Sequence, residues 1–432
     1  MSRASLAPAA LSLPRRSHLG LELSRSARPP RTGSAPRPGE AAERLWVEVV
    51  DEGSPAARAG VQVGDALLAI GDTETNGLDQ VRKLVARLSV SEPSRLVLER
   101  SERHIELWPQ AEPLPLEALG VGEVVLAQVP WRSHRLRAIW SFPESTEPVP
   151  AIWLLPGAAW LSEEHPIEPR SARLELVRGL TRAGFATLRV ERSGLGDSEG
   201  PACTELDLPA ELEGWQAASH YFRSHPRVRA DARFLYARSL GGMLAPVLTK
   251  PGDFAALAVW GTSARPWPQG MLAASERQYR LAGRSGAALE RTLAQLAELH
   301  ELVYGAGLSP ELAFERRPDL RGADPLSFQG RYVYGRVAAF FQQLAALDVA
   351  AAWRRVECPV LALHGGSDWL SLAEDSAEVA ALAPQGSFQE LAGIDHMMHA
   401  RPSVEAAFAE PWGGSFSPLA LDALVAFYRR FT

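Results

Sequence analysis

The sequence of 432 residues contains only two cysteines, Cys203 and Cys358, which lie far apart and outside any CxxC or His-rich spacing. Such a pair cannot hold a structural zinc, so no metal site is predicted. No apolar run approaches the roughly 20 residues that a membrane-spanning helix requires. The net charge of -6 is small for this length, which argues against binding to nucleic acid or to an anionic membrane. We therefore expect a soluble, cytoplasmic protein.

The remaining composition is that of a globular protein with a large core, because 46% of the residues are hydrophobic and 22% are charged. The length favours two domains. Residues 25–40 are dense in Pro, Arg, Ser and Gly, which predicts a mobile loop. We expect a disordered N-terminus at residues 1–10, a first domain at residues 11–110 and a second at residues 111–432.

The first domain has the pattern of a small β-rich module with two helices. Strands are predicted at residues 45–50, 66–70, 95–98 and 104–108. A short helix is predicted at residues 56–59. A second is predicted at residues 78–88, where apolar residues recur at helical spacing.

From about residue 122 onward, strands alternate with helices, which is typical of a largely parallel sheet covered on both faces. Eight strands are predicted, at residues 124–129, 136–142, 151–155, 186–190, 234–237, 256–259, 360–363 and 388–391. A mostly helical stretch of about 100 residues separates the sixth of these strands, at residues 256–259, from the seventh, at residues 360–363, which is far more than an ordinary connection. This insertion, at residues 264–354, would form either a lid over a binding site or additional packing.

The strongest local signal for chemistry is Ser239, which follows an apolar strand and begins the helical sequence Leu-Gly-Gly. A serine in a sharp strand-to-helix turn projects its hydroxyl group and requires small residues two positions before and after it. Ala237 and Gly241 satisfy this requirement. The backbone N–H of Leu240, at the helix N-terminus, would donate to an oxyanion.

A serine nucleophile requires an imidazole base and an acid that orients it. Asp368 and His396 follow predicted strands in the order Ser, acid, His. We therefore expect Ser239, Asp368 and His396 to form a catalytic triad that needs no cofactor. Three other residues could replace members of this set: His399 for His396, Asp395 for Asp368, and His364 near the acid.

A second oxyanion donor is expected from the loop after the third strand, Leu-Pro-Gly-Ala-Ala-Trp at residues 155–160. Gly157 would allow the backbone to approach the site. The N–H of Ala158 is the first candidate and that of Ala159 the second, and an ordinary turn is the alternative.

Taken together, these residues resemble the α/β-hydrolase superfamily from about Gly122 to Thr432, which implies an eight-stranded, mostly parallel sheet with a helical cap. Residues 190–200 (VERSGLGDSEG) are similar to the family's loop after strand four, which implies that this loop supports the site. Residues 261–266, the long insertion and the turn at residues 393–396 resemble a bacterial group of carboxylesterases with an extra amino-terminal domain. The sequence departs from the pattern in three places: Arg238 replaces the usual His, Ala237 replaces the usual Gly, and the expected oxyanion loop lacks the frequent His-Gly.

The first domain resembles a PDZ domain. Residues 53–65 (GSPAARAGVQVGD) are close to the family hallmark, and residues 18–21 (HLGL) look like its carboxylate-binding loop. The resemblance implies that a peptide C-terminus binds as an added strand, its carboxylate held by the N–H groups of Leu19, Gly20 and Leu21. The alternative is a module that acts only as a spacer.

The expected activity is therefore hydrolysis of small carboxylic esters through an acyl-enzyme. Two alternatives stay open. One is a serine peptidase or amidase, and the other is a catalytically inactive hydrolase scaffold that acts as a PDZ adaptor.

Overall fold

The computed structural model of the chain describes residues 13–24, 45–165, 171–324 and 327–432. The expected disordered N-terminus at residues 1–10 and the expected mobile loop at residues 25–40 lie outside these ranges. The described residues form two compact units, Pro14–Leu116 and a larger one that groups Leu13 with Glu117–Thr432. Within the larger unit, Arg137 donates a hydrogen bond of 2.8 Å to the carbonyl oxygen of Leu13. No helix among the described residues is long and apolar enough to cross a membrane.

The smaller unit is built on one antiparallel sheet with the strand order β2-β3-β4-β6-β7. Its strands are β2 (Leu21–Ser24), β3 (Leu45–Val50), β4 (Ala66–Ile70), β6 (Leu96–Arg100) and β7 (Arg103–Leu107), with β5 (Thr73–Glu74) beside β4. The helices are α1 (Pro55–Ala59) and α2 (Leu78–Val85), and β1 (Ser17–His18) pairs with β8 (Glu112–Pro113). The four predicted strands and both predicted helices are confirmed, although α2 ends three residues early.

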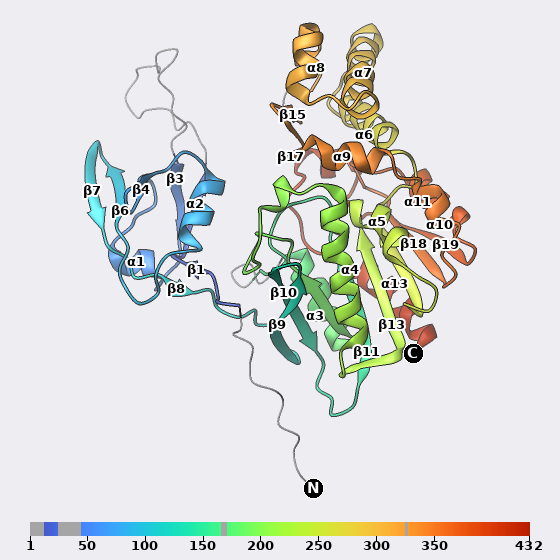
Figure 1. The fold of residues 1–432 in the computed structure, drawn as a ribbon, viewed down its shortest axis with the longest axis horizontal. Helices are drawn as coiled ribbons and strands as arrows, with labels where there is room; N and C mark the ends of the chain where they lie inside the picture. The colour runs from blue at the N-terminus through green and yellow to red at the C-terminus, as the bar shows by residue number, and fades with distance from the viewer. Residues whose placement is uncertain (1–12, 25–44, 166–170, 325–326) are drawn as a thin grey trace. The chain divides into compact units, whose positions relative to one another are not determined.

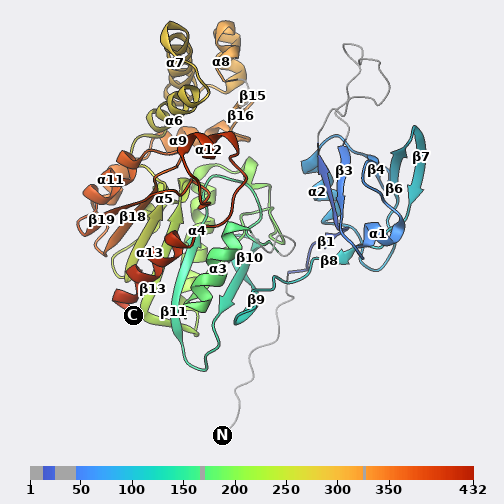
Figure 2. The ribbon, with the colours of Figure 1, turned by 180° about the vertical axis from the view of Figure 1, so that it is seen from behind.

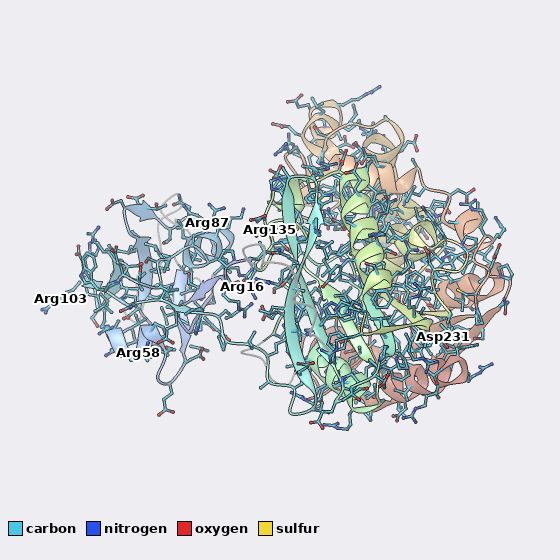
Figure 3. The ribbon with its side chains drawn as sticks, turned by 60° about the horizontal axis from the view of Figure 1, so that its bottom comes forward. Arg16, Arg58, Arg87, Arg103, Arg135 and Asp231 are labelled. Atoms are coloured by element: carbon cyan, nitrogen blue, oxygen red, sulfur yellow. The ribbon has the colours of Figure 1, made fainter. Side chains whose placement is uncertain are left out.

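Local chemistry explains the turns of this unit. The Ser54 hydroxyl caps α1 by accepting a hydrogen bond of 3.2 Å from the N–H of Ala57. Asp65, which is only 1% exposed, binds the guanidinium of Arg100 through two hydrogen bonds of 2.7 Å. Exposed charged side chains such as Arg103 point outward (Figure 3).

The larger unit contains the predicted eight-stranded sheet, in the order β19-β18-β14-β13-β11-β12-β10-β9. The strands are β9 (Glu123–Trp131), β10 (His134–Phe142), β11 (Val149–Leu155), β12 (Ala186–Val190), β13 (Val228–Arg238), β14 (Ala256–Trp260), β18 (Val360–Gly365) and β19 (Gly386–Leu391). The strands from β12 to β19 pair in parallel, whereas β10 is antiparallel to both of its neighbours. This is the fold of an α/β-hydrolase, as predicted.

Helices cover both faces of this sheet (Figures 1 and 2). One face packs against α3 (Ala172–Arg182) and α13 (Pro418–Tyr428). The other packs against α4 (Leu208–Ser224), α5 (Leu240–Leu248), α10 (Val349–Trp353) and α11 (Ala373–Leu382). Side chains of β11 alternate between the two cores, with Ile152 and Leu154 on the α3 side and Trp153 and Leu155 on the α4 side.

The insertion between β14 and β18 gathers at one edge of the sheet (Figure 1). It comprises α6 (Trp267–Leu281), α7 (Gly286–His300), α8 (Pro310–Arg316), α9 (Ala338–Ala345) and the short strands β15 (Phe328–Gln329), β16 (Tyr332–Val333) and β17 (Arg336–Val337). The small sheet was not predicted, because strands of two residues leave no alternation to detect.

The insertion lies over the carboxyl ends of the parallel strands. Trp160, which follows β11, donates to the carbonyl oxygen of Tyr334 at 3.4 Å. Arg277 of α6 donates to the carbonyl oxygen of Asp368, which follows β18, at 2.7 Å. We call α6–α9 and the small sheet the cap.

Candidate active site

Ser239 stands at the junction of β13 and α5, with φ at 53° and ψ at -123°. A positive φ is costly for a residue with a side chain, and such strain is characteristic of functional turns. Two hydrogen bonds of 2.8 Å hold the strained residue: its N–H donates to the carbonyl oxygen of Trp260, and its own carbonyl oxygen accepts from Thr262 Oγ1. The serine therefore occupies the sharp turn that the sequence indicates.

The close approach of strand and helix explains why small residues flank the serine. A Cβ atom at Gly241 would lie only 2.5 Å from the carbonyl oxygen of Pro156, and one at Gly242 would lie 2.5 Å from Thr262 Oγ1. Ala237 is fully buried. Larger side chains at these positions would force the turn open.

Asp368 and His396 form a buried pair, with 2.7 Å between Asp368 Oδ2 and His396 Nδ1. Asp368 also accepts hydrogen bonds from the N–H groups of Leu370 and Ser371, at 2.7 and 2.9 Å, and from the Ser371 hydroxyl at 2.6 Å. Burial opposes ionisation of Asp368, but the charge of His396 and these hydrogen bonds lower its pKa to about 2. Asp368 is thus a carboxylate that accepts from Nδ1–H, which directs the Nε2 lone pair of His396 away from the acid.

The end of β14 lies between the serine turn and this pair. Trp260 accepts the N–H of Ser239 and donates its indole N–H to the carbonyl oxygen of His396 at 3.0 Å. A Cβ atom at Gly261 would lie 3.0 Å from the imidazole and 3.2 Å from Asp368 Oδ2. The structure therefore brings the three loops to one edge of the sheet. Ser239 is partly exposed, and within the described residues its hydroxyl makes no hydrogen bond.

The three competing residues have other partners. Asp395 Oδ2 accepts from Arg401 at 2.9 Å, and Asp395 Oδ1 accepts from the N–H groups of Met397 and His399. His399 Nδ1 lies 3.7 Å from Asp395. His364 is buried, with its Nδ1 3.4 Å from the hydroxyl of Ser376. The acid that pairs with His396 is Asp368.

The loop that carries Ala158 packs directly against the serine. A Cβ atom at Gly157 would lie 3.3 Å from Ser239 Cβ and 3.9 Å from its hydroxyl oxygen. Ala158 and Ala159 are exposed, whereas Leu240 is buried as the first residue of α5. The N–H groups proposed for oxyanion binding thus come from two segments that meet at Ser239.

A buried charge network, not predicted from the sequence, supports this loop. Arg192 donates to the carbonyl oxygens of Gly157 and Ala159 and lies 3.2 Å from Glu211 of α4. Glu211 also binds Arg336 of the cap at 2.5 Å. All three charged side chains are nearly fully buried. Burial opposes ionisation of Glu211, but the two guanidinium groups lower its pKa.

Part of this network had a signal in the sequence. Arg192 belongs to the loop at residues 190–200, for which a supporting role was expected. Glu211 and Arg336 had no such signal in the sequence, because a charged residue in a helix or loop pattern is ordinarily exposed. Arg277 and Ser371, which contact Asp368, depend on the path of the cap and of a loop, and sequence periodicity does not reveal either.

In the PDZ-like unit, residues 19 and 20 form the turn between β1 and β2. Gly20 has φ at 69°, and a Cβ atom there would lie 2.3 Å from the Cβ of Ser54. The carbonyl oxygens of Leu19 and Gly20 accept from Ala56 and Asp51, both at 2.9 Å, which fixes the turn. Leu21 begins β2, the edge strand of its sheet. The three predicted residues therefore lie together beside a strand edge that pairs with no other strand in the described parts of the chain.

Comparison with known proteins agrees with this architecture. A PDZ-domain family model matches residues 46–100, and a model described as serine aminopeptidase, S33, matches residues 170–402. Comparison with curated proteins gave no match.

Among solved structures, Est1E from Butyrivibrio proteoclasticus with bound ferulic acid is similar at 16% identity and a TM-score of 0.47, over 71% of this chain and 98% of that one. An esterase from Thermogutta terrifontis is similar at 17% identity and a TM-score of 0.41, over 72% and 100%. Because the S33 model matches more than half of the 432 residues, the chain belongs to the serine aminopeptidase S33 family and is a serine hydrolase of the α/β type with an N-terminal PDZ domain.

Proposed function

We propose that the protein hydrolyses carboxylic esters with Ser239 as nucleophile, His396 as general base and Asp368 as the acid that orients the base. His396 takes the hydroxyl proton as Ser239 attacks the ester carbonyl carbon. The N–H groups of Leu240 and Ala158 stabilise the oxyanion. The protonated imidazole then gives its proton to the leaving alcohol, and water releases the acyl group by the same steps.

The observation that carries this proposal is the 2.7 Å contact between Asp368 and His396, held beside a serine in a strained turn. Buried acid–imidazole pairs also occur for structural reasons, but the positive φ of Ser239 is a cost that needs its own explanation. The strain is explained if it presents the hydroxyl group to a substrate.

Charge favours an ester over the substrate of an aminopeptidase. An aminopeptidase must bind the protonated amino group at the peptide N-terminus. Among the residues that the structure describes, the cavity near Ser239 is lined by Arg173, Arg189 and Arg238 and by a single carboxylate, Glu163, which is paired with Arg173 at 3.1 Å. An excess of positive charge would repel a free amino terminus.

A fluorophosphonate probe tests the nucleophile directly. We expect one equivalent to modify the wild-type chain at Ser239, and the Ser239→Ala variant to lose both labelling and hydrolysis of a 4-nitrophenyl ester. Ser224→Ala, at the exposed end of α4, is the matched control and should behave as wild type. Absence of labelling would instead support an inactive scaffold. Cleavage of peptide amides but not of esters would establish a peptidase.

We further propose that the PDZ domain binds the C-terminus of a partner peptide along β2. The support is the position of Leu19, Gly20 and Leu21 at the open end of an edge strand, since such an edge accepts an added strand. Fluorescence anisotropy with the full chain should show binding of a peptide with a free C-terminal carboxylate and an apolar last residue. Equal binding of the C-terminally amidated peptide would contradict recognition of the carboxylate.

A further inference from the structure

A cavity of about 40 Å³ lies next to the candidate active site. One water molecule needs roughly 10–15 Å³ on this scale, so the space accommodates a group the size of a carboxylate. Its lining comes from β11 and the loop after it, from α3, from β12, from β13 and from the loop after His396. Most of the lining side chains are apolar: Leu154, Leu155, Pro156, Ala172, Leu176, Val177, Met397 and Met398.

Three of the candidate catalytic segments, but not the one that carries Asp368, contribute to this cavity through a neighbouring residue. Arg238 directly precedes Ser239, Met397 directly follows His396, and Gly157 directly precedes Ala158. The cavity is therefore lined by chain neighbours of the proposed nucleophile, base and oxyanion donor.

Two of the three arginines that line the cavity are neutralised. Arg189 binds Glu117 through two hydrogen bonds, of 2.6 and 2.9 Å, and both side chains are buried. Arg173 binds Glu163 at 3.1 Å. These two pairs add no net charge to the cavity.

Arg238 is the exception. Within the part of the chain that the structure describes, its guanidinium makes no hydrogen bond and no ion pair. Burial, together with the nearby charge of Arg173, lowers its pKa to about 10, so the side chain still carries its proton at neutral pH. The Arg238 side chain is partly exposed and lines a cavity whose walls are mostly apolar, so an anion bound there would supply the partner that this guanidinium lacks among the described residues.

We propose that Arg238 binds a carboxylate group of the substrate, so that the enzyme prefers esters that carry a second, ionised carboxyl group. This inference rests on the proposed esterase function and specifies its substrate class. The planar guanidinium matches a carboxylate in a two-bond fork. A single negative charge neutralises the one uncompensated positive charge, whereas a phosphate dianion would leave a buried negative charge. The apolar walls suit the methylene groups that join the two carboxyl carbons of a dicarboxylic monoester.

The test compares two esters of the same shape. The 4-nitrophenyl monoesters of succinic, glutaric and adipic acid carry the charge, and the corresponding monoamides, with CONH2 in place of the carboxylate, do not. We expect kcat/KM of wild type to be about 10- to 100-fold higher for the best monoester than for its amide partner, since hydrogen bonds to charged groups contribute this much. Spontaneous hydrolysis, measured with Ser239→Ala, is subtracted.

Three variants assign the preference to Arg238. In Arg238→Met the ratio of the two kcat/KM values should fall to about one, through a higher KM for the charged ester. Arg238→Lys should retain part of the ratio. Arg280→Met, which removes an exposed arginine of the cap, should leave the ratio unchanged. Thermal unfolding of each variant verifies that it is folded.

The outcomes separate this inference from the proposed function. Hydrolysis of the neutral esters that depends on Ser239, without any preference for the charged partner, overturns the carboxylate site and leaves the esterase standing. A preference that survives in Arg238→Met also overturns it. If no ester is hydrolysed, calorimetric titration of Ser239→Ala with adipate and with adipamide decides: binding of adipate that Arg238→Met abolishes supports the site, and equal binding of both compounds refutes it.

Discussion

Arg192 and Gly157 are joined by a hydrogen bond from the guanidinium to the carbonyl oxygen, and this bond orients the next peptide N–H. The peptide unit is planar and trans, so the N–H of Ala158 points opposite to the carbonyl group that Arg192 holds. A second bond, 3.0 Å from Arg192 to the carbonyl oxygen of Ala159, fixes the following unit. A donated hydrogen bond at the carbonyl also polarises the peptide and strengthens its N–H as a donor.

Arg192→Lys should therefore lower kcat with little change in KM. Lysine keeps the charge but cannot bridge two carbonyl oxygens and Glu211 at once. Because loss of an oxyanion donor lowers kcat about 10²- to 10³-fold, we expect about a 10- to 100-fold decrease when the donor is only loosened. Arg178→Lys is the control, since Arg178 also donates to two carbonyl oxygens, of Leu119 and Ala118, away from the site. Equal kcat values for wild type and Arg192→Lys would contradict this role.

Glu211→Gln should strongly destabilise the larger unit. Glu211 is the carboxylate shared by Arg192 and Arg336, and removal of its charge leaves two buried guanidinium groups uncompensated. We expect the free energy of unfolding to fall by about 3–5 kcal/mol. Glu213→Gln, on the same helix, removes one partner of the exposed pair with Arg132. It should change the free energy of unfolding by less than about 1 kcal/mol. Denaturant titration measures both values, and similar losses would refute the argument.

The sequence predicted the central sheet well because its strands are physically simple. Residues 151–155 and 360–363 are continuous apolar runs. Runs of this length are typical of strands that are buried on both faces. Ser239, Asp368 and His396 were predicted for a related reason. Ser239 and Asp368 follow buried strands and His396 follows the edge strand β19, and the carboxyl ends of parallel strands share one edge of a sheet.

The features that were not predicted from the sequence depend on long-range packing. Glu211 and Arg336 are 125 residues apart in sequence, and their charges alone suggested exposure. The β15–β17 sheet consists of strands of two residues. That Arg238 has no hydrogen-bonded or ionic partner among the described residues depends on where Arg173, Glu163 and Tyr236 lie around it, and no local pattern encodes that arrangement.

Gly261→Ala should reduce activity more than stability. Gly261 has φ at 54°, where a side chain costs about 1–2 kcal/mol, and its new methyl group would lie 3.0 Å from the His396 imidazole. Displacement of the base should lower kcat about 10- to 100-fold. Gly252→Ala is the matched control, because Gly252 also has a positive φ, of 76°, but open space around it. It should lose similar stability and keep its activity. Comparable kcat values for the two variants would show that the imidazole tolerates the methyl group.

His300 should make stability depend on pH. It is buried at the end of α7, its Nδ1 lies 3.2 Å from the carbonyl oxygen of Pro268, and it contacts the rings of Tyr304 and Phe328. Burial is the main cause that lowers its pKa to about 4, from about 6.5 in the unfolded chain. Between these two values the unfolded chain binds a proton that the folded cap excludes. The free energy of unfolding therefore falls as the pH decreases from about 6.5 to about 4, by about 3 kcal/mol in total.

Replacing His300 with Gln should remove this contribution. The amide can still donate to Pro268 and does not titrate, so the stability of His300→Gln should decline less than that of wild type as the pH is lowered from 7.5 to 4.5. Denaturant titrations at several pH values measure the difference between the two slopes. His220→Gln, at an exposed position of α4, should keep the wild-type slope. If His300→Gln follows the wild-type curve throughout, the folded cap does not keep the imidazole of His300 neutral. Local opening of α7 would then allow the imidazole to bind a proton.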